Sequence, residues 1–340
     1  MKKNFISSIL MLSSIFALTS CQKKEIEKLN SNSTTASTNG SLSVLTSDIL
    51  RYYYKGSTNN NIYSGNSTDG TNWISTLISN GATLQSGPAA AFFNGNIYVF
   101  HRGRTNNNLY YSYSVNRGDS WSADAALGNN AGTASSPSAC TFNGKMFLAY
   151  VSATFNSAPG YSNIYYSYSS NGSTWTEAIL PFTTYSEPCI YSYGNKIYIA
   201  YATSNLASIN IISSTDGITW TQASSLNYSS VHYSVAVNPN GKACLVRTDR
   251  TGQINVSYSD DLINWSLPTY LLSTSGAIAG STVRPSITFD NVNNRFVVAY
   301  RSNTHNNDNI YYADDRDGVL KERGTANGST TDAPYLISTN

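Results

Sequence analysis

Apolar and polar residues alternate in short runs along most of this chain, and the runs end at tight-turn signals. Residues 164–175 show the unit: alternating Tyr and Ser, then Asn171-Gly172, then Trp175. Such alternation predicts half-buried β-strands. Asn-Gly tolerates the positive φ angles of a tight reversal. We therefore predict two strands joined by a hairpin, with Trp175 as the apolar anchor of the second.

This unit recurs through the chain. Its Trp returns at intervals of 48, 54, 45 and 45 residues, at Trp73, Trp121, Trp175, Trp220 and Trp265. A sixth copy, over residues 310–318, lacks the Trp. Another pair of strands precedes each hairpin, as at residues 88–93 and 97–102. A repeat of this length with four strands in each copy is typical of propeller blades.

The first copy is incomplete at its start. Residues 50–55 and 61–64 match a second and a third strand, with no first strand before them. Residues 331–337 have the form of a first strand, so we predict that they pair with residues 50–55 and close the ring. The predicted fold is all-β: a six-bladed β-propeller of four-stranded antiparallel blades, over residues 44–340.

The N-terminal segment has the form of a bacterial export signal. Lys2 and Lys3 precede an apolar run over residues 5–17, and residues 18–21 (Leu-Thr-Ser-Cys) resemble a lipobox. The resemblance implies a signal peptide over residues 1–20 and lipidation of Cys21, which would anchor the protein to a membrane. The alternative is an ordinary signal peptide that ends near a Cys. Residues 21–43, rich in Asn, Ser and Thr, are expected to be a flexible tether.

Residues 22–25 (Gln-Lys-Lys-Glu) resemble the short charged tags that send some Gram-negative lipoproteins to the cell surface. We therefore expect an outer-membrane, surface-exposed protein. Charged residues make up only 12% of the chain and the net charge is +2. This argues against a nucleic-acid partner, which would need a basic stripe. Cys140, Cys189 and Cys244 are expected to be small buried residues, and their spacing is not that of metal ligands, so we expect no metal site. We also expect no cofactor and a monomeric protein.

The turn sequences resemble the Asp-box, or BNR repeat, of the sialidase superfamily. Residues 114–121 (S-V-N-R-G-D-S-W) match its full form with Asn in place of Asp, and residues 214–220 match a version one residue shorter. Asp or Asn accepts turn N–H bonds, Gly supplies positive φ and Trp packs between strands. The resemblance implies a propeller with its ligand site at the axis. It does not specify a function.

Two sets of residues are expected to meet at a central mouth. Those just before the first strands are, in blade order, Ala333, Gly87, Ser136, Glu187, His232 and Arg284. Those that end the second strands are Tyr54, His101, Tyr150, Tyr201, Arg247 and Tyr300, with Arg102 and Arg301 one residue later. Successive side chains of a strand point to opposite faces of the sheet, so Arg102 and Arg301 have the alternative of pointing into solvent.

The chemistry of these residues suits a glycan. Arg247 and Arg284 offer planar forks of donors for a carboxylate. Glu187 and His232 can bond hydroxyl groups, while Tyr201 or Tyr300 can stack on a sugar ring. His101, Arg102 and Arg301 complete the expected binding set. Each also has a structural interpretation as a paired or hydrogen-bonded residue. We favour a surface-anchored carbohydrate-binding propeller, with an acidic ligand.

Two enzyme classes remain as alternatives. Resemblance to exo-sialidases implies a Tyr nucleophile paired with a Glu and an acidic proton donor, for which Tyr300, Glu187 and Asp332 are the candidates. The family's arginine at the first inner strand is missing, because Ala333-Pro334 stands there. A uronate polysaccharide lyase could use His232, Tyr300 and Arg284. A structural or protein-binding propeller is also open.

Overall fold

Twenty-four β-strands form six four-stranded antiparallel sheets in the described part of the chain. The computed structural model describes residues 50–82, 86–128, 131–153, 162–203, 206–230, 232–303, 305 and 307–339. The expected signal peptide, Cys21 and tether lie outside the described residues. Within the described ranges, no helix is long and apolar enough to cross a membrane.

Each sheet is one blade, in which the strands follow one another from the axis outward. Blade 1 contains, from the innermost strand to the outermost, β24 (Tyr335–Ser338), β1 (Leu50–Lys55), β2 (Asn61–Ser67) and β3 (Ile74–Ala82). Blade 2 contains β4 (Ala89–Phe93), β5 (Asn96–Arg102), β6 (Leu109–Ser114) and β7 (Ala125–Ala126). Blade 3 contains β8 (Ser138–Phe142), β9 (Lys145–Val151), β10 (Ser162–Ser169) and β11 (Thr176–Thr184).

The second half of the ring repeats the plan. Blade 4 contains β12 (Cys189–Tyr193), β13 (Lys196–Ala202), β14 (Ile209–Ser214) and β15 (Thr221–Leu226). Blade 5 contains β16 (His232–Val237), β17 (Ala243–Thr248), β18 (Ile254–Ser259) and β19 (Thr269–Tyr270). Blade 6 contains β20 (Ser286–Asp290), β21 (Arg295–Arg301), β22 (Asn309–Asp314) and β23 (Lys321–Ser329).

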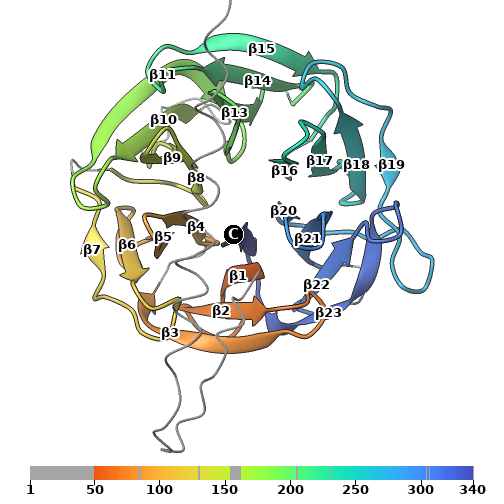
Figure 1. The fold of residues 1–340 in the computed structure, drawn as a ribbon, viewed down its shortest axis with the longest axis horizontal. Helices are drawn as coiled ribbons and strands as arrows, with labels where there is room; N and C mark the ends of the chain where they lie inside the picture. Colours follow the sequence, from red (N-terminus) through yellow and green to blue (C-terminus); the bar gives the residue numbers. More distant parts are fainter. Residues whose placement is uncertain are drawn as a thin grey trace, which may run out of the picture. The chain divides into compact units, whose positions relative to one another are not determined.

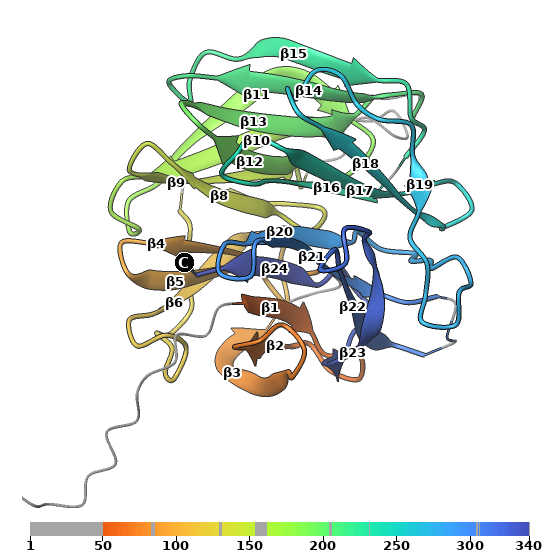
Figure 2. The ribbon, with the colours of Figure 1, turned by 45° about the vertical axis from the view of Figure 1, so that its right-hand side comes forward.

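The C-terminal strand closes the ring, as predicted. β24 pairs antiparallel with β1, from Leu50 opposite Ser338 to Tyr53 opposite Tyr335. The innermost strands contact one another in the cyclic order β24, β4, β8, β12, β16, β20 (Figure 1). β24 lies beside β1 although nearly the whole propeller separates them in sequence (Figure 2). β24 thus gives blade 1 its fourth strand and covers the inner edge of β1.

Side chains at one position of the innermost strands join neighbouring blades. Ser138 Oγ of blade 3 accepts a hydrogen bond from the Ile190 amide of blade 4, at 3.1 Å. Ser286 Oγ of blade 6 accepts one from the Leu336 amide of blade 1, at 2.8 Å. The innermost strands have a free edge, so these bonds satisfy backbone groups that the sheets leave open.

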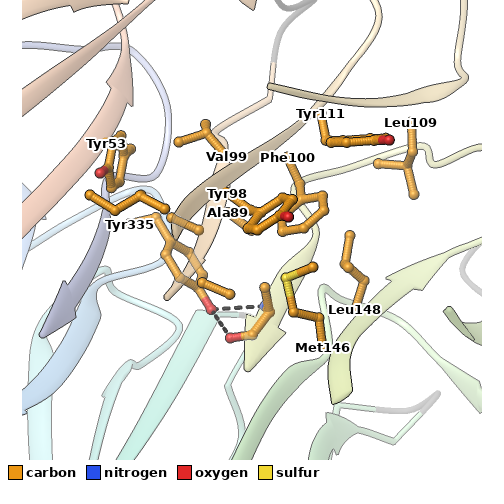
Figure 3. Packing of buried hydrophobic residues seen from close by; sticks show 14 of the residues in the cluster. Tyr53, Ala89, Tyr98, Val99, Phe100, Leu109, Tyr111, Met146, Leu148 and Tyr335 are labelled. Atoms are coloured by element: carbon orange, nitrogen blue, oxygen red, sulfur yellow. Dashed lines mark hydrogen bonds between the residues drawn. The ribbon is translucent and has the colours of Figure 1, made fainter. Parts of the chain in front are cut away.

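Blade 2 departs from this pattern because it has Ala89 at the equivalent position. Tyr335 of blade 1 reaches past blade 2 instead (Figure 3). Its hydroxyl donates to the Ala139 carbonyl at 2.7 Å and accepts from the Ala139 amide at 2.8 Å. Burial raises the pKa of Tyr335 to about 12, so the hydroxyl stays protonated and able to donate. One tyrosine therefore connects blades 1 and 3.

The Asp-box turns have the structural role that their sequence predicts. Asp216 Oδ1 accepts from the amides of Ile218 and Thr219, at 2.7 Å each, and these bonds lower the pKa of Asp216. Each Trp then packs on the preceding blade, as Trp220 does on the Tyr166 ring at 5.7 Å. In the sixth copy, buried Leu320 takes the place of the missing Trp.

Candidate functional site

The two faces of the ring differ in their connections. The loops from second to third strands, and those from one blade to the next, lie on one face, which we call the loop face. The turns between first and second strands and the Asp-box turns lie on the other, which we call the turn face. The sequence places the expected site on the loop face.

Three of the expected residues do meet at the axis of the loop face. The Glu187 carboxylate lies 3.6 Å from Arg284 Nε and accepts the Ser136 amide at 3.1 Å. His232 lies in the electrostatic range of both Glu187 and Arg284. Burial lowers the pKa of His232, which favours its neutral form. These residues come from blades 4, 5 and 6, as the repeat alignment predicts.

Arg284 closes the axis at this face. Its side chain is only 2% exposed, and its guanidinium donates to the carbonyls of Pro137 at 2.9 Å and Pro188 at 3.3 Å. It also lies over the Tyr335 ring, 5.8 Å from its centroid. Arg284 therefore joins blade 6 to blades 3 and 4, and three of its nitrogens already have partners. The expected role in holding a ligand carboxylate stays a prediction that this geometry does not favour.

The cavity on the axis lies toward the opposite face. It has a volume of about 750 Å³, and its lining runs from the middle of the inner strands to turn residues such as Gly194, Asn238 and Asn291. No charged residue lines it; hydroxyl groups, aromatic rings and the thiols of Cys140 and Cys189 do. The expected mouth on the loop face is thus corrected: the axis is closed there by Arg284 and hollow toward the turn face.

The second-strand residues do not face the axis. Their side chains stand perpendicular to the sheets, between blades, and their polar ends meet residues farther out in the same blade. His101 Nε2 lies 3.3 Å from Asp124 Oδ1, and Tyr150 donates to Glu177 on β11. Tyr201 accepts from Asn210 at 3.3 Å. All three are at most 4% exposed, so the expected gathering of this set at one mouth is wrong.

The candidate catalytic residues are also apart. The Tyr300 hydroxyl donates to Glu322 on β23, not to Glu187, and burial beside Glu322 raises the pKa of Tyr300. Asp332 forms an ion pair with Lys55 at 2.9 Å. The outer-strand carboxylates, Glu322 among them, were missed by the sequence analysis. The signal available was their place in the repeat, because Glu177 and Glu322 are each the second residue of a fourth strand.

The two arginines that end second strands are tied to nearby loops. Arg102 donates to Asn107 and to the Ala134 carbonyl, at 3.0 Å each. Arg301 pairs with Asp308 at 2.8 Å, with a quarter of its side chain exposed. A polar pocket of about 380 Å³ surrounds Arg301 and includes Thr282, Asn303 and Asn307. Arg301 is thus accessible, whereas Arg102 serves the loop conformation.

Between the blades, third-strand tyrosines form a repeated surface that the sequence analysis did not single out. Tyr63 stacks on Tyr54 at 5.3 Å, Tyr110 on His101 at 6.0 Å and Tyr165 on Tyr150 at 6.2 Å. Tyr63, Tyr110 and Tyr165 are all half-buried, and we call them the tyrosine platforms.

Loop amides hold two of these platforms in place. Asn59 Nδ2 donates to the Tyr63 hydroxyl, and Asn106 Nδ2 donates to the Tyr110 hydroxyl, both at 3.1 Å. Tyr311 of blade 6 has the same support from Asn307 at 3.2 Å. However, the His305 ring covers Tyr311, stacked at 4.4 Å. The platforms of blades 1 to 3 are therefore more open than their counterpart in blade 6.

Blade 5 has a different chemistry at the same place. Arg247 replaces the second-strand tyrosine, and Asn255 replaces the platform tyrosine. Arg247 is 6% exposed and its guanidinium lies over the Tyr228 ring, 4.6 Å from the centroid. No described contact joins Arg247 to Arg284, so the two arginines do not form one carboxylate clamp.

No group of three or more His, Cys, Asp or Glu residues capable of holding a metal ion occurs in the described ranges. Cys140, Cys189 and Cys244 are free thiols, and Cys140 is half-buried, not fully buried as expected. The described side chains at the site thus offer hydrogen bonds, aromatic faces and guanidinium groups.

Comparisons with known proteins place this architecture among other propellers. No family model matches the sequence, and no curated protein matches it. A fucose-specific lectin from Aleuria aurantia has a similar structure, with a TM-score of 0.64 and 14% identity over 83% of this chain and 92% of the lectin. A mutant of AofleA from Arthrobotrys oligospora follows at 0.59 and 14%, over 82% of each chain. YjhT gives 0.51 and 11%, over 76% of this chain and 91% of its own. At these identities the similarity shows the fold: a six-bladed β-propeller.

Proposed function

We propose that this protein is a carbohydrate-binding propeller, and that the tyrosine platforms are its stacking surfaces. The observation that carries the proposal is the repeated arrangement of Tyr63, Tyr110 and Tyr165. Each is a half-buried ring, fixed from below by a second aromatic ring on the neighbouring strand.

The chemistry of the platforms suits a sugar. The apolar faces of saccharide rings pack on aromatic rings, while nearby amides and hydroxyls bond the sugar hydroxyls. Asn59 and Asn106 lie at the edges of two platforms and are exposed. A ring held by packing loses little side-chain entropy when it binds, which favours affinity. Three such surfaces on one face would also strengthen binding to a branched or repeating glycan.

The lectin of similar fold is named for fucose, so fucosylated glycans belong among the first ligands to test. The Asp-box turns support membership of the sialidase superfamily, which we likewise propose. The hydrolase alternative has no contact in its favour, since Tyr300 bonds Glu322 while Glu187 bonds Arg284. We therefore favour binding without bond cleavage.

Glycan binding can be tested with substitutions inside one strand. Tyr110→Ala removes a platform on β6. Tyr113→Ala, on the same strand but toward the turn face, removes an exposed ring that also stacks on a tyrosine, Tyr98 at 5.5 Å. Loss of one platform should weaken binding to an array-selected glycan about 2- to 12-fold, which corresponds to about 0.5–1.5 kcal/mol for an aromatic contact.

The triple variant at Tyr63, Tyr110 and Tyr165 should abolish binding, whereas Tyr113→Ala should bind like the wild type. If the triple variant keeps full glycan affinity, the platforms are not the binding surface. If the wild type binds no glycan across a broad array, the proposed function itself fails.

From the sequence alone, we also propose that lipidated Cys21 displays the propeller at the outer membrane, which would suit capture of external glycans. Cys21→Ser should then move the protein from the membrane fraction to the soluble fraction. A variant that stays with the membrane would contradict the proposed anchor.

A further inference from the structure

The interior of blade 5 differs from its neighbours in charge balance. In blade 2, the Asp124 carboxylate lies 3.3 Å from His101 Nε2 and accepts a hydrogen bond from Ser112. In blade 3, Glu177 accepts from Tyr150, which also bonds Ser167 at 2.9 Å. A carboxylate at or beside the fourth strand thus lies next to the second-strand side chain in both blades, and in blade 3 it accepts a hydrogen bond from that side chain.

Each of these blades combines a second-strand side chain, a third-strand serine and a carboxylate, and blade 5 has counterparts of the first two. By register, Arg247 stands where His101 and Tyr150 stand, and Ser257 stands where Ser112 and Ser167 stand. β19 pairs Thr269 with Val256, which puts Pro268 opposite Ser257 at the place of the carboxylate. Blade 5 therefore has a cation and a hydroxyl, but no acidic side chain between them.

One atom of each remaining group has no hydrogen-bond partner in the described part of the chain. Arg247 Nε and Ser257 Oγ are both buried and form no hydrogen bond. Among the described residues, Arg247 makes a single hydrogen bond, a long one to the Ser229 carbonyl at 3.4 Å. Burial of a guanidinium is costly, because its charge loses water. Asp249 lies within electrostatic range of Arg247, yet burial is the larger effect and lowers the pKa of Arg247.

The nearest acidic side chain does not fill this need. Asp249 accepts hydrogen bonds from Thr251, Gln253 and Asn255, and no ion pair joins it to Arg247 among the described residues. Arg250 adds a second guanidinium nearby, since its Nε donates to Ser229 Oγ at 2.7 Å. The surroundings therefore favour an incoming anion.

The surface above this site has sugar-binding features. Tyr228 covers the guanidinium, and Tyr270 on β19 is 49% exposed. β19 contains only two residues, and the rest of the outer edge of β18 is bonded by Ser266, opposite Tyr258, and by Leu271, opposite Ile254. An approaching saccharide would meet aromatic rings first and the cation beneath them.

We propose that Arg247 and Ser257 form a subsite for a carboxylate carried by the bound glycan, such as that of a uronic acid unit. This inference rests on the proposed carbohydrate-binding function and names the chemistry of one ligand group. The ligand carboxylate plays the part for Arg247 and Ser257 that Asp124 plays for His101 and Ser112 in blade 2, because Pro268 supplies no acidic group there. Blade 5 would then recognise an acidic unit, while the tyrosine platforms of blades 1 to 3 stack on neutral ones.

The test compares a glucuronate-containing oligosaccharide with its neutral glucose counterpart by calorimetry. The wild type should prefer the acidic ligand, and Arg247→Ala should weaken it on the order of 10- to 100-fold while leaving the neutral ligand unchanged. Pro268→Glu should have the same effect with Arg247 intact, because it supplies the missing carboxylate from within the chain. Arg117→Ala, an exposed arginine on the turn face, is the matched control and should change neither ligand.

Each outcome is informative. If the wild type binds acidic and neutral ligands equally, and neither Arg247→Ala nor Pro268→Glu changes these affinities, the carboxylate subsite is overturned while carbohydrate binding stands. Equal binding of a 6-sulfated sugar would overturn the specificity for carboxylate. If no oligosaccharide binds, the proposed function fails, and thermal shift with sodium glucuronate then tests the subsite alone. Sodium glucuronate should raise the Tm of the wild type and leave the Tm of Pro268→Glu unchanged. If Arg247→Ala does not fold, Pro268→Glu replaces it as the variant that lacks the subsite. No shift would overturn the subsite.

Discussion

Two buried tyrosines in the wall of the central cavity should respond in opposite ways to the loss of one oxygen atom. Tyr335 and Tyr191 both line the cavity and are at most 9% exposed. The Tyr335 hydroxyl makes two backbone hydrogen bonds to Ala139, whereas the Tyr191 hydroxyl has none among the described residues. Substitution by Phe keeps the ring in each case, so only the hydroxyl is tested.

The magnitude follows from the groups left behind. Tyr335→Phe leaves the amide and carbonyl of Ala139 unsatisfied, and each such buried group costs about 1–3 kcal/mol. Because Ala139 also lines the cavity, water can replace one partner, and we expect a loss of about 2 kcal/mol. Tyr191→Phe removes a buried hydroxyl that lacks a hydrogen bond, so stability should be unchanged or rise by up to about 1 kcal/mol.

Urea unfolding followed by far-UV circular dichroism gives both values, with the slope of the transition as a check that the unfolded state is unaltered. In thermal unfolding, Tyr335→Phe should lower Tm by roughly 3 °C, because an unfolding entropy of about 2.1 cal/mol/K per residue gives about 1.6 °C per kcal/mol for a domain of this size. Equal losses in the two variants would refute the reasoning, because the measured effect would then not depend on the hydrogen bonds.

Two further predictions concern the Asp-box and His232 at the axis of the loop face. Trp220→Ala should lower the free energy of unfolding by about 3–5 kcal/mol, since it removes a large ring packed between blades, and should leave the glycan affinity of the folded protein unchanged. Loss of binding at normal stability would instead make the box part of the site. His232 has a pKa lowered by burial, so its contribution to stability is present above its unfolded pKa of about 6.5 and is lost as pH falls below that value. His232→Gln should therefore lose less unfolding free energy than the wild type between pH 7.5 and 5.5, and parallel losses in the two proteins would contradict this.

The blades and the ring closure could be predicted from the sequence because they depend on local patterns. Alternation, Asn-Gly turns and the Trp spacing each act over a few residues, and the form of residues 331–337 revealed the closing strand. The meeting of Glu187, His232 and Arg284 also followed, because equivalent positions in a ring converge at its axis.

The direction of side chains could not be predicted in the same way. Residues that end second strands, such as Tyr150 and Tyr300, lie near the loop face, but the pleat turns their side chains between blades. Their partners, Glu177 and Glu322, lie on the fourth strands, where bulges shift the register and weaken the repeat in sequence. The sequence analysis expected Arg284 to be open to ligand, because no sequence pattern indicates that a guanidinium will bond backbone carbonyls of other blades.

The pairing of the last strand with the first has a consequence for how the chain is made. Synthesis runs from the N-terminus, so β1 emerges early and its inner edge must wait for β24, while Tyr52 waits for a partner 275 residues downstream. The entropy of closing so long a loop grows only slowly with its length, which makes late closure feasible once the other blades are in place. A chain without β24 would expose the inner edge of β1 and lose the Leu336 amide that bonds Ser286 of β20, and an exposed edge invites aggregation. Residues 50–82 alone cannot complete blade 1, so the propeller stays open until β24 has been made and has joined it.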